Sequence, residues 1–236
     1  AIIAIEAIMK GTMGEMTDML GSAAQLMVRQ ADIADTSLSA IDERVGDKIA
    51  ALPEVKDVSG IMFGVAMLPE TGGFIVLQGY PPHSYIINRI NIVEGKPLTS
   101  NHEILIGRSI ADALHKDVGD TIDLSGYRYR VVGIYESKIG WEELGAIMTL
   151  RDGQVFLGRP RKVTLLGVRL KNPQQAASMV EKINKEFPDV HAALAGEFVN
   201  ELPDMQSSYA MVGSISLLAI LVGGIGVLNT MLMSVF

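Results

Sequence analysis

The last 32 residues of this 236-residue chain, Met205–Phe236, contain no charged side chain. Within them the stretch Val212–Phe236 is almost entirely apolar, and about 20 consecutive apolar residues are enough for a helix to span a bilayer. The alternative is a buried core helix, but such helices are usually shorter and carry polar residues at helical spacing. We therefore predict that residues 205–236 form a stalk and a transmembrane helix.

Small residues form one stripe along this predicted helix. Ala219, Gly223, Gly226 and Thr230 follow one another at spacings of four, three and four residues, which places them on one face. Glycine weakens a helix in water, whereas small residues are favoured where helices approach closely in a membrane. We predict that these four residues pack against another helix, in this chain or in a second one.

The first residues are the second unusual segment. Ala1–Met9 is apolar apart from Glu6, is too short to span a bilayer, and lacks the basic start and cleavage site of a signal peptide. A stripe of methionine and leucine side chains continues one face to Gly21, a residue type at which helices often stop. We predict that residues 1–21 are the end of a first membrane helix and its stalk, cut from a longer chain.

The residues between about 22 and 204 combine short apolar runs with amphipathic stretches, as mixed α/β domains do. Ser39 is a candidate cap for a helix through Leu52, and Asn172-Pro173 is a strong start for a helix through Phe187. The predicted strands are Ala24–Arg29, Val58–Leu68, Phe74–Gly79, Val163–Leu170 and Val190–Leu194.

Two of these regions resemble each other. In Lys48–Val55 and in Lys182–Val190, an amphipathic helix ends at a large apolar residue, a proline stops it, and an acidic residue leads into a strand. The match suggests two βαβ-like halves, with residues 83–160 inserted between them. The insertion is predicted to be β-rich, with a strand at Ile104–Gly107, a helix at Ser109–His115 and a hairpin of Thr121–Leu124 with Tyr127–Tyr135.

The composition and the missing motifs exclude several classes of function. The 27 acidic residues outnumber the 20 basic ones, so the net charge of −7 gives no reason to expect a nucleic-acid partner. The sequence has no phosphate-binding P-loop, no HExxH metal motif, no G-x-S-x-G elbow and no cysteine. We therefore expect no catalytic residue, no cofactor and no metal in this chain.

Two pairs of residues are weaker candidates for a site, and each has a simpler interpretation. Asp112 and His115 lie one helical turn apart, but a metal site normally needs three or four ligands, so a solvated surface pair is favoured. Glu142-Glu143, beside Trp141, is a possible carboxylate pair. Adjacent residues of a loop point in different directions, so we favour an exposed loop in which Trp141 has a contact role.

Several segments resemble one known family of membrane proteins. Ser214–Ser234, with its Gly-Gly-Ile-Gly-x-x-Asn core, resembles the second transmembrane helix of MacB/FtsX-type ABC transporter permeases, a group that includes the lipoprotein-releasing LolC and LolE. Val118–Tyr135 is similar to the family's β-insert hairpin, Val93–Leu98 to its E-G-R-x-L/F segment, and Phe74–Pro82 to the strand and turn before the insert. The resemblance covers essentially the whole chain.

The resemblance implies an α+β extracytoplasmic domain, residues about 10–210, held at the cell (inner or plasma) membrane. Residues 22–82 and 161–204 would form its Porter-like part, and residues 83–160 its β-rich Sabre-like insertion. Residues 1–21 and 205–236 would be the flanking stalks and membrane helices. The third and fourth helices, the basic run after the second helix and the ATPase domain of the family are not present in this sequence.

The resemblance further implies a permease subunit that couples ATP hydrolysis in the cytoplasm to a conformational change outside, for export or lipoprotein release. The partners would be an ABC ATPase, a second permease in a homodimer or heterodimer, membrane lipid, and a periplasmic adaptor or lipoprotein. The alternative is a membrane-tethered sensor or an activator of a cell-wall hydrolase. An adjacent ATPase gene, without a hydrolase or kinase gene, would favour export. An exported hydrolase has no catalytic constellation to support it.

Overall fold

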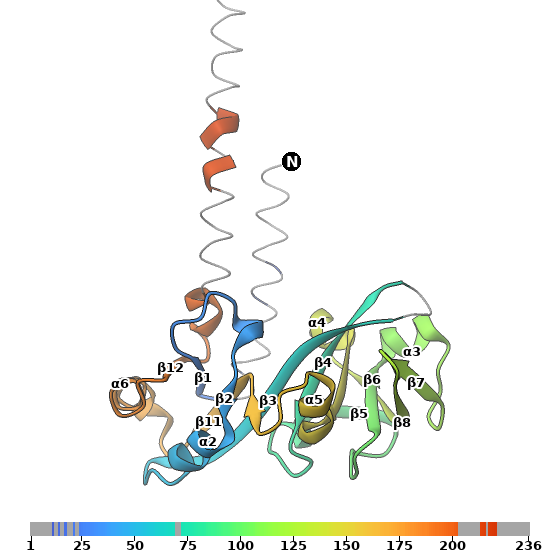
Figure 1. Cartoon of the computed structure of the whole chain (residues 1–236), viewed down its shortest axis with the longest axis horizontal. Coiled ribbons are helices and arrows are strands. Elements are labelled where there is room, and N and C mark those ends of the chain that lie inside the picture. The colour runs from blue at the N-terminus through green and yellow to red at the C-terminus, as the bar shows by residue number, and fades with distance from the viewer. Residues whose placement is uncertain are drawn as a thin grey trace, which may run out of the picture.

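The computed structural model describes residues 24–68 and 72–202, the single residues Gly11, Gly14, Thr17 and Gly21, and the helical residues 213–215 and 217–220 (Figure 1). No helix within this described part is both long and apolar enough to cross a membrane. Most of the predicted transmembrane helix, and most of the predicted first helix in residues 1–21, lies outside the described residues.

Ten strands of the described chain form one mixed sheet in the order β12-β1-β11-β3-β4-β9-β6-β8-β5, with β7 paired to β8. In chain order these strands are β1 (Leu26–Gln30), β3 (Val55–Met67), β4 (Phe74–Tyr80), β5 (Asn91–Gly95), β6 (Glu103–Gly107), β7 (Thr121–Leu124), β8 (Tyr127–Glu136), β9 (Gly145–Thr149), β11 (Leu165–Leu170) and β12 (Val190–Leu194). A separate two-stranded sheet joins β2 (Ile41–Asp42) to β10 (Lys162–Val163). The predicted mixture of helices and strands is confirmed.

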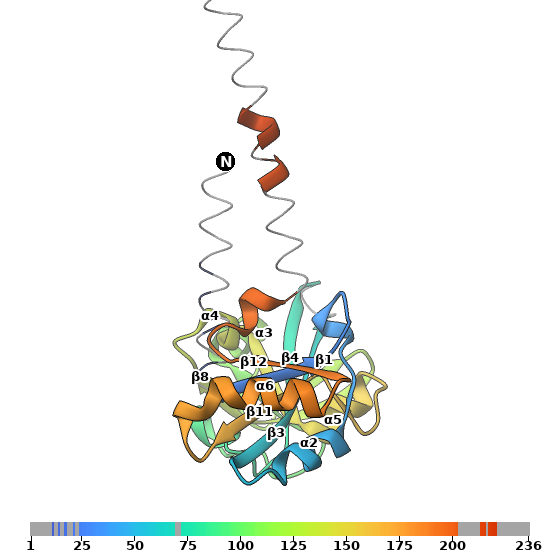
Figure 2. The ribbon, with the colours of Figure 1, turned by 90° about the vertical axis from the view of Figure 1, so that its left-hand side faces the viewer.

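The first part of the large sheet consists of the antiparallel strands β12, β1, β11 and β3. Helix α2 (Glu43–Ala50) lies between β1 and β3 in the chain, and helix α6 (Ala176–Glu186) lies between β11 and β12. Strand β11 lies between β1 and β3, the two strands that α2 connects. Strand β1 likewise lies between β11 and β12, which α6 connects, so the arrangement is a split βαβ. Both helices cover one face of these strands, where Ile49 and Ile183 are fully buried in the same core cluster (Figure 2).

The two segments that resemble each other in sequence lie next to each other in the fold. Lys182 of α6 donates a hydrogen bond to the carboxylate of Glu54, which follows α2, at 2.9 Å. The backbone N–H of Lys171 donates to the Glu54 carbonyl at 3.0 Å. The hydrogen bond from Lys182 holds the pKa of the Glu54 carboxyl below its usual value. The ends of both helices are therefore linked by charge as well as by packing.

The second part of the sheet begins within β3, whose later residues pair with β4 instead of β11. Strand β4 pairs in parallel with β9, and β6 pairs in parallel with β8. Helices α3 (Arg108–Leu114) and α5 (Leu150–Phe156) pack on these strands, and a second core contains the buried side chains of Ile104, Ile106 and Met148. Because β3 belongs to both parts, a single sheet runs through the described domain.

Local sequence patterns placed many of these elements correctly. The predicted strand Val190–Leu194 is β12, and the predicted hairpin is β7 with β8, which is one residue longer than expected. Asn172 caps a short 3₁₀ helix, η3 (Pro173–Gln175), that leads into α6. The predicted strand Val163–Leu170 is divided at Thr164, because β10 pairs with β2 whereas β11 pairs with β1 and β3.

The start of α2 differs from the prediction. Asp42, and not Ser39, caps this helix, because its carboxylate accepts a hydrogen bond from the Arg44 backbone N–H at 3.0 Å. The pairing of β2 with β10 keeps Ile41 and Asp42 extended and delays the helix. The buried Ser39 hydroxyl instead accepts a hydrogen bond from the backbone N–H of Gln30 at 3.0 Å. Tertiary strand pairing has therefore overridden a local capping signal.

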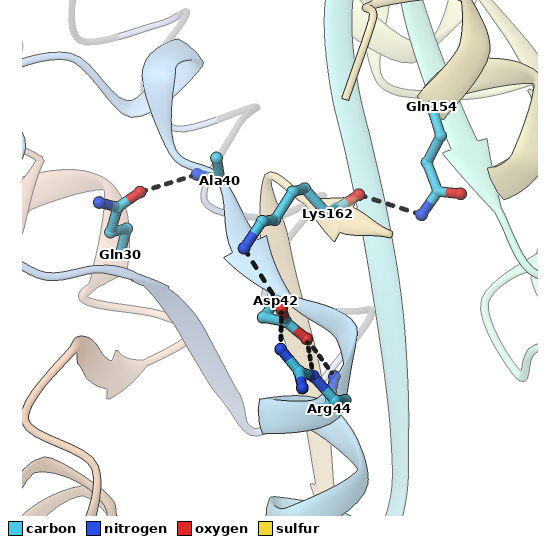
Figure 3. Close-up of polar contacts among 6 residues, drawn as sticks. All are labelled: Gln30, Ala40, Asp42, Arg44, Gln154 and Lys162. Atoms are coloured by element: carbon cyan, nitrogen blue, oxygen red, sulfur yellow. Dashed lines mark hydrogen bonds and ion pairs between the residues drawn. The ribbon is translucent and has the colours of Figure 1, made fainter. Parts of the chain in front are cut away.

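Figure 3 shows the polar contacts around β2. The Asp42 carboxylate forms ion pairs with the Arg44 side chain (Nε to Oδ1, 2.9 Å) and with Lys162 (Nζ to Oδ2, 3.3 Å). The Gln154 side chain of α5 donates to the carbonyl of Lys162 at 3.1 Å. These bonds connect α2 to β10 and β10 to α5.

We expect Asp42→Asn to weaken the acid sensitivity of the chain. The Arg44 side chain and backbone N–H, together with Lys162, hold the pKa of Asp42 below its ordinary value of 3.8. A lowered carboxyl pKa contributes stability that is present above pH 3.8 and is lost as the pH falls below it. Asparagine still caps the helix but carries no charge. The urea unfolding midpoint should therefore fall less between pH 6 and pH 3 in Asp42→Asn than in the wild type, and an equal fall in both would contradict this.

Candidate functional site

The described domain begins and ends on one face of the sheet, opposite α2 and α6. Ala24, just before β1, and Leu202, just after the 3₁₀ helix η4 (Phe198–Glu201), are buried in the same apolar cluster. The backbone N–H of Ala195 donates to the Gln25 carbonyl at 2.9 Å and joins the two ends directly. We call this the junction cluster, and its buried members are Ala24, Met27, Ile61, Tyr80, Ile86, Ile87, Leu98, Leu105, Val132, Tyr135, Ile147, Leu165, Ala193, Ala195, Phe198, Val199 and Leu202.

A cavity of about 370 Å³ adjoins the junction cluster, and we call it the Gln78 cavity. Its walls come from β3, β4, β9, the end of β8, helix α4 (Gly140–Glu143), and the loop that contains the 3₁₀ helix η2 (Ile87–Arg89). Figure 1 shows α4 on the upper side of the sheet and α2 on the lower side. The lining residues are Ile61, Gln78, Tyr80, Ile86, Arg89, Ile90, Asn91, Tyr135, Glu136, Ser137, Lys138, Ile139, Glu142 and Ile147.

Gln78 is the buried polar group of this cavity. It occupies the middle of β4, only 2% of it is exposed, and its Oε1 accepts a hydrogen bond from the Tyr80 hydroxyl at 2.5 Å. Its Nε2 has no hydrogen-bond partner among the described residues. Gln78 is not among the candidate residues predicted from the sequence. The available signal was one glutamine within the otherwise apolar or glycine run Phe74–Tyr80.

Glu142 forms a second polar wall. The Ser137 hydroxyl donates to its carboxylate (Oγ to Oε2, 2.7 Å), and the Arg89 guanidinium lies 3.6 Å from Oε1. The Tyr135 hydroxyl donates to the Glu142 carbonyl at 2.7 Å. Burial raises the pKa of the Tyr80 and Tyr135 hydroxyls, and the negative charge of Glu142 raises both further. Both tyrosines therefore stay protonated and act as hydrogen-bond donors.

The interpretation of Glu142-Glu143 as an exposed loop is wrong. These residues end α4, the Glu142 side chain is only 22% exposed, and the Glu143 carboxylate accepts a hydrogen bond from the Ser137 backbone N–H at 2.6 Å. The side chain of Trp141 lies outside the described part of the chain. Both carboxylates are held by Ser137, which was not visible as a partner in the sequence.

Two glycines allow α4 to lie against the strands. A Cβ atom added at Gly107, the last residue of β6, would lie 2.0 Å from the Glu143 carbonyl oxygen. One added at Gly145, the first residue of β9, would lie 3.0 Å from the Glu142 carbonyl oxygen and 3.2 Å from the Tyr135 hydroxyl. Any larger residue would displace α4, and with it the Glu142 wall of the cavity.

The segment Val93–Leu98, which resembles the E-G-R-x-L/F motif, has a clear structural role. Gly95 has a φ of +83° and faces Gly133 of β8 across the strand pair. A Cβ atom at Gly95 would lie 2.2 Å from the Val132 carbonyl oxygen, so a residue with a side chain fits there only if the two strands move apart. Leu98 is buried in the junction cluster. The motif therefore fixes the close pairing of β5 with β8 beside the junction cluster.

The other residues singled out from the sequence are not brought together. Ala219 is helical and exposed, whereas Gly223, Gly226 and Thr230 lie outside the described residues. Asp112 and His115 are both exposed. No group of three or more histidine, aspartate or glutamate side chains in the described part is arranged to hold a metal ion.

Comparisons with known proteins identify relatives of this fold. A family model described as the MacB-like periplasmic core domain matches residues 1–186. The chain is similar to the crystal structure of the periplasmic region of MacB from Actinobacillus actinomycetemcomitans, with 12% identity, a TM-score of 0.58, and coverage of 75% of this chain and 91% of that one. The chain is also similar to the crystal structure of the extracellular domain of YknZ, a noncanonic ABC-type transporter from Gram-positive bacteria. The identity is 12%, the TM-score is 0.56, and the match covers 71% of this chain and 98% of that one. No curated protein matches the sequence. At this identity, the two structures show a shared fold.

Proposed function

The chain belongs to the MacB-like periplasmic core domain family, and from this premise we propose that it acts as part of an ABC transporter permease subunit of the MacB/FtsX type. In this role, residues about 10–210 lie outside the cell membrane. They change conformation when a cytoplasmic ATPase binds and hydrolyses ATP. This movement, rather than passage of a substrate through the domain, serves export or lipoprotein release.

The observation that supports this role is the junction cluster. Ala24 and Leu202, where the described domain begins and ends, are buried in the same cluster. The segments that flank the domain are therefore joined to one packed face of the sheet. A packed core transmits displacement because it is dense and has few voids. A relative movement of the two flanking segments would thus act on the sheet and on the adjacent Gln78 cavity.

We keep the division of the chain that the resemblance implies. Residues 22–82 and 161–204 are the Porter-like part, 83–160 the Sabre-like insertion, and 1–21 and 205–236 the stalks and membrane helices. The split βαβ arrangement of β1, β3, β11 and β12 supports the first assignment. Strand β4 pairs with both β3 and β9, so the two parts share hydrogen bonds and are expected to move together at this boundary.

The proposed partners are an ABC ATPase, a second permease subunit, membrane lipid, and a periplasmic adaptor or lipoprotein. We propose that Ala219, Gly223, Gly226 and Thr230 form the face along which the membrane helix packs on another helix. This rests on their spacing and on the preference for small residues at such contacts. The chain itself supplies no catalytic residue in this proposal.

The full-length protein, purified from membranes in detergent, is expected to carry a bound ATPase. Mass spectrometry of the purified complex identifies the partner. Candidate export substrates, added one at a time, should change its rate of ATP hydrolysis because the outer domain and the ATPase are coupled. If the purified complex contained a cell-wall hydrolase or a kinase and no ATPase, this result would overturn the export role.

A second candidate function is a membrane-tethered sensor or an activator of a cell-wall hydrolase. The observation that favours it is the Gln78 cavity, because a pocket with a buried, unpartnered donor is suited to binding a small ligand. The same purification separates the two candidates. Transport proteins would retain the ATPase, whereas an activator would retain its hydrolase.

A further inference from the structure

We propose that the Gln78 cavity binds an uncharged amide with a branched aliphatic side chain, the chemistry of a leucine or valine residue within a peptide. This inference goes beyond the coupling role and does not depend on it. It rests on the polar groups, the apolar walls and the charge balance of the cavity.

The polar evidence is the unpartnered end of the Gln78 amide. Buried polar groups in folded proteins are nearly always hydrogen-bonded. The Oε1 atom of Gln78 is satisfied by the Tyr80 hydroxyl, whereas the Nε2 donor has no partner in the described part of the chain. A carbonyl oxygen on a ligand would supply the missing acceptor. The Glu142 carboxylate, which lines the same cavity, can accept the amide N–H of that ligand.

The apolar walls indicate an aliphatic group. Isoleucine side chains line the cavity from several elements, and the volume of about 370 Å³ is within the usual range of about 300–1,000 Å³ for small-molecule sites. Burying a branched side chain among them removes its apolar surface from water. These isoleucines are Ile61, Ile86, Ile90, Ile139 and Ile147.

The charges around the cavity favour a neutral ligand. Two basic side chains, Arg89 and Lys138, and two acidic ones, Glu136 and Glu142, line it. Arg89 is already paired with Glu142. An anionic or cationic ligand would meet as many like charges as opposite ones and would compete with this ion pair. An uncharged amide leaves the pair intact.

The test titrates the complete 236-residue chain in detergent with capped amino acids, followed by calorimetry and by NMR. N-acetyl-leucinamide is expected to bind saturably, at least tenfold more tightly than N-acetyl-alaninamide, because it buries three more carbon atoms. Free leucine and N-acetyl-leucinate carry charges and should bind more weakly than N-acetyl-leucinamide. Absence of binding to the wild type, or equal binding of the charged forms, would overturn the proposal.

The matched variants are Gln78→Met and Gln154→Met. Both replace a buried glutamine with an apolar side chain of similar length, but Gln154 donates to the Glu43 carboxylate and to the carbonyl of Lys162, both outside the cavity. Gln78→Met should bind N-acetyl-leucinamide about five- to tenfold more weakly, the usual effect of one lost neutral hydrogen bond. Gln154→Met should bind it as the wild type does, once corrected for the folded fraction measured by circular dichroism. Equal affinity in Gln78→Met and the wild type would show that Gln78 does not recognise the ligand.

No ATP or ATPase is needed for these titrations. Failure of the proposed transport role would therefore leave their results unchanged. A failure of the titrations would likewise leave the coupling experiments unaffected.

Discussion

Replacing Phe198 with alanine is expected to lower the free energy of unfolding by about 3–5 kcal/mol, the usual cost of removing a buried aromatic side chain. Phe198 is 1% exposed and lies in η4, between β12 and Leu202 at the end of the described domain. Urea unfolding of the chain in detergent measures this loss, with the fluorescence of its single tryptophan as the signal.

Phe74→Ala is the matched control for this experiment. Phe74 is 69% exposed at the start of β4, so its replacement should change the free energy of unfolding by about 0.5 kcal/mol or less. An equally small loss for Phe198→Ala would contradict the packing of η4 into the junction cluster.

In the proposed transporter, the junction cluster is expected to carry the coupling. Phe198→Leu keeps an apolar side chain and should fold, but it leaves part of the space around η4 unfilled. We expect ATP hydrolysis to continue while transport falls, because the end of the domain is less firmly attached to the sheet. Transport and hydrolysis both at the wild-type rate would contradict a coupling role for this residue.

Gly95→Ala is expected to destabilise the fold by about 2–6 kcal/mol. Gly95 has a φ of +83°, and a conformation of this kind costs a residue with a side chain about 1–3 kcal/mol. The added methyl group would also lie 2.2 Å from the Val132 carbonyl oxygen and 2.7 Å from the Gly133 Cα. Because both are backbone atoms, the strands must separate, and overpacking of this kind typically costs about 1–3 kcal/mol more.

Gly126→Ala separates the two causes. Gly126 has a similar φ of +87°, but a Cβ atom there would meet nothing within 4 Å. Its replacement should therefore cost only the conformational part. The difference between the two urea unfolding free energies measures the steric part at Gly95. Equal losses of unfolding free energy in the two variants would show that β5 and β8 can separate freely, which would contradict their close pairing at Gly95.

Sequence patterns predicted the elements whose causes are local. The alternation of Thr121–Leu124 and the proline of Asn172-Pro173 act within a few residues, and the structure contains β7 and α6 at these places. Strand β9 was missed because all five of its residues, Gly145–Thr149, are buried, so it shows no alternation. Its parallel partner β4 lies far away in the sequence.

The candidate site was less predictable than the fold. Gln78 lies far in the sequence from Ser137 and Glu142, and it lines the same cavity only because β4 is placed beside α4 and the loop that precedes α4. Adjacent carboxylates at Glu142-Glu143 suggested an exposed loop, although Ser137, which donates a hydrogen bond to each of them, lies only five residues before Glu142. Polar partners brought together by sheet order leave no pattern in a single sequence.

The sequence by itself determined the family, the mixed α/β class and the prediction of a membrane segment in the uncharged stretch Met205–Phe236. These follow from local composition, periodicity and motifs, which are properties of contiguous residues. Only the tertiary structure decided that β3 joins the two parts of the sheet, that Ala24 and Leu202 share one cluster, and that a cavity lies beside it. The physical reason is that strand pairing and burial depend on residues far apart in the chain, which meet only when the whole domain has folded.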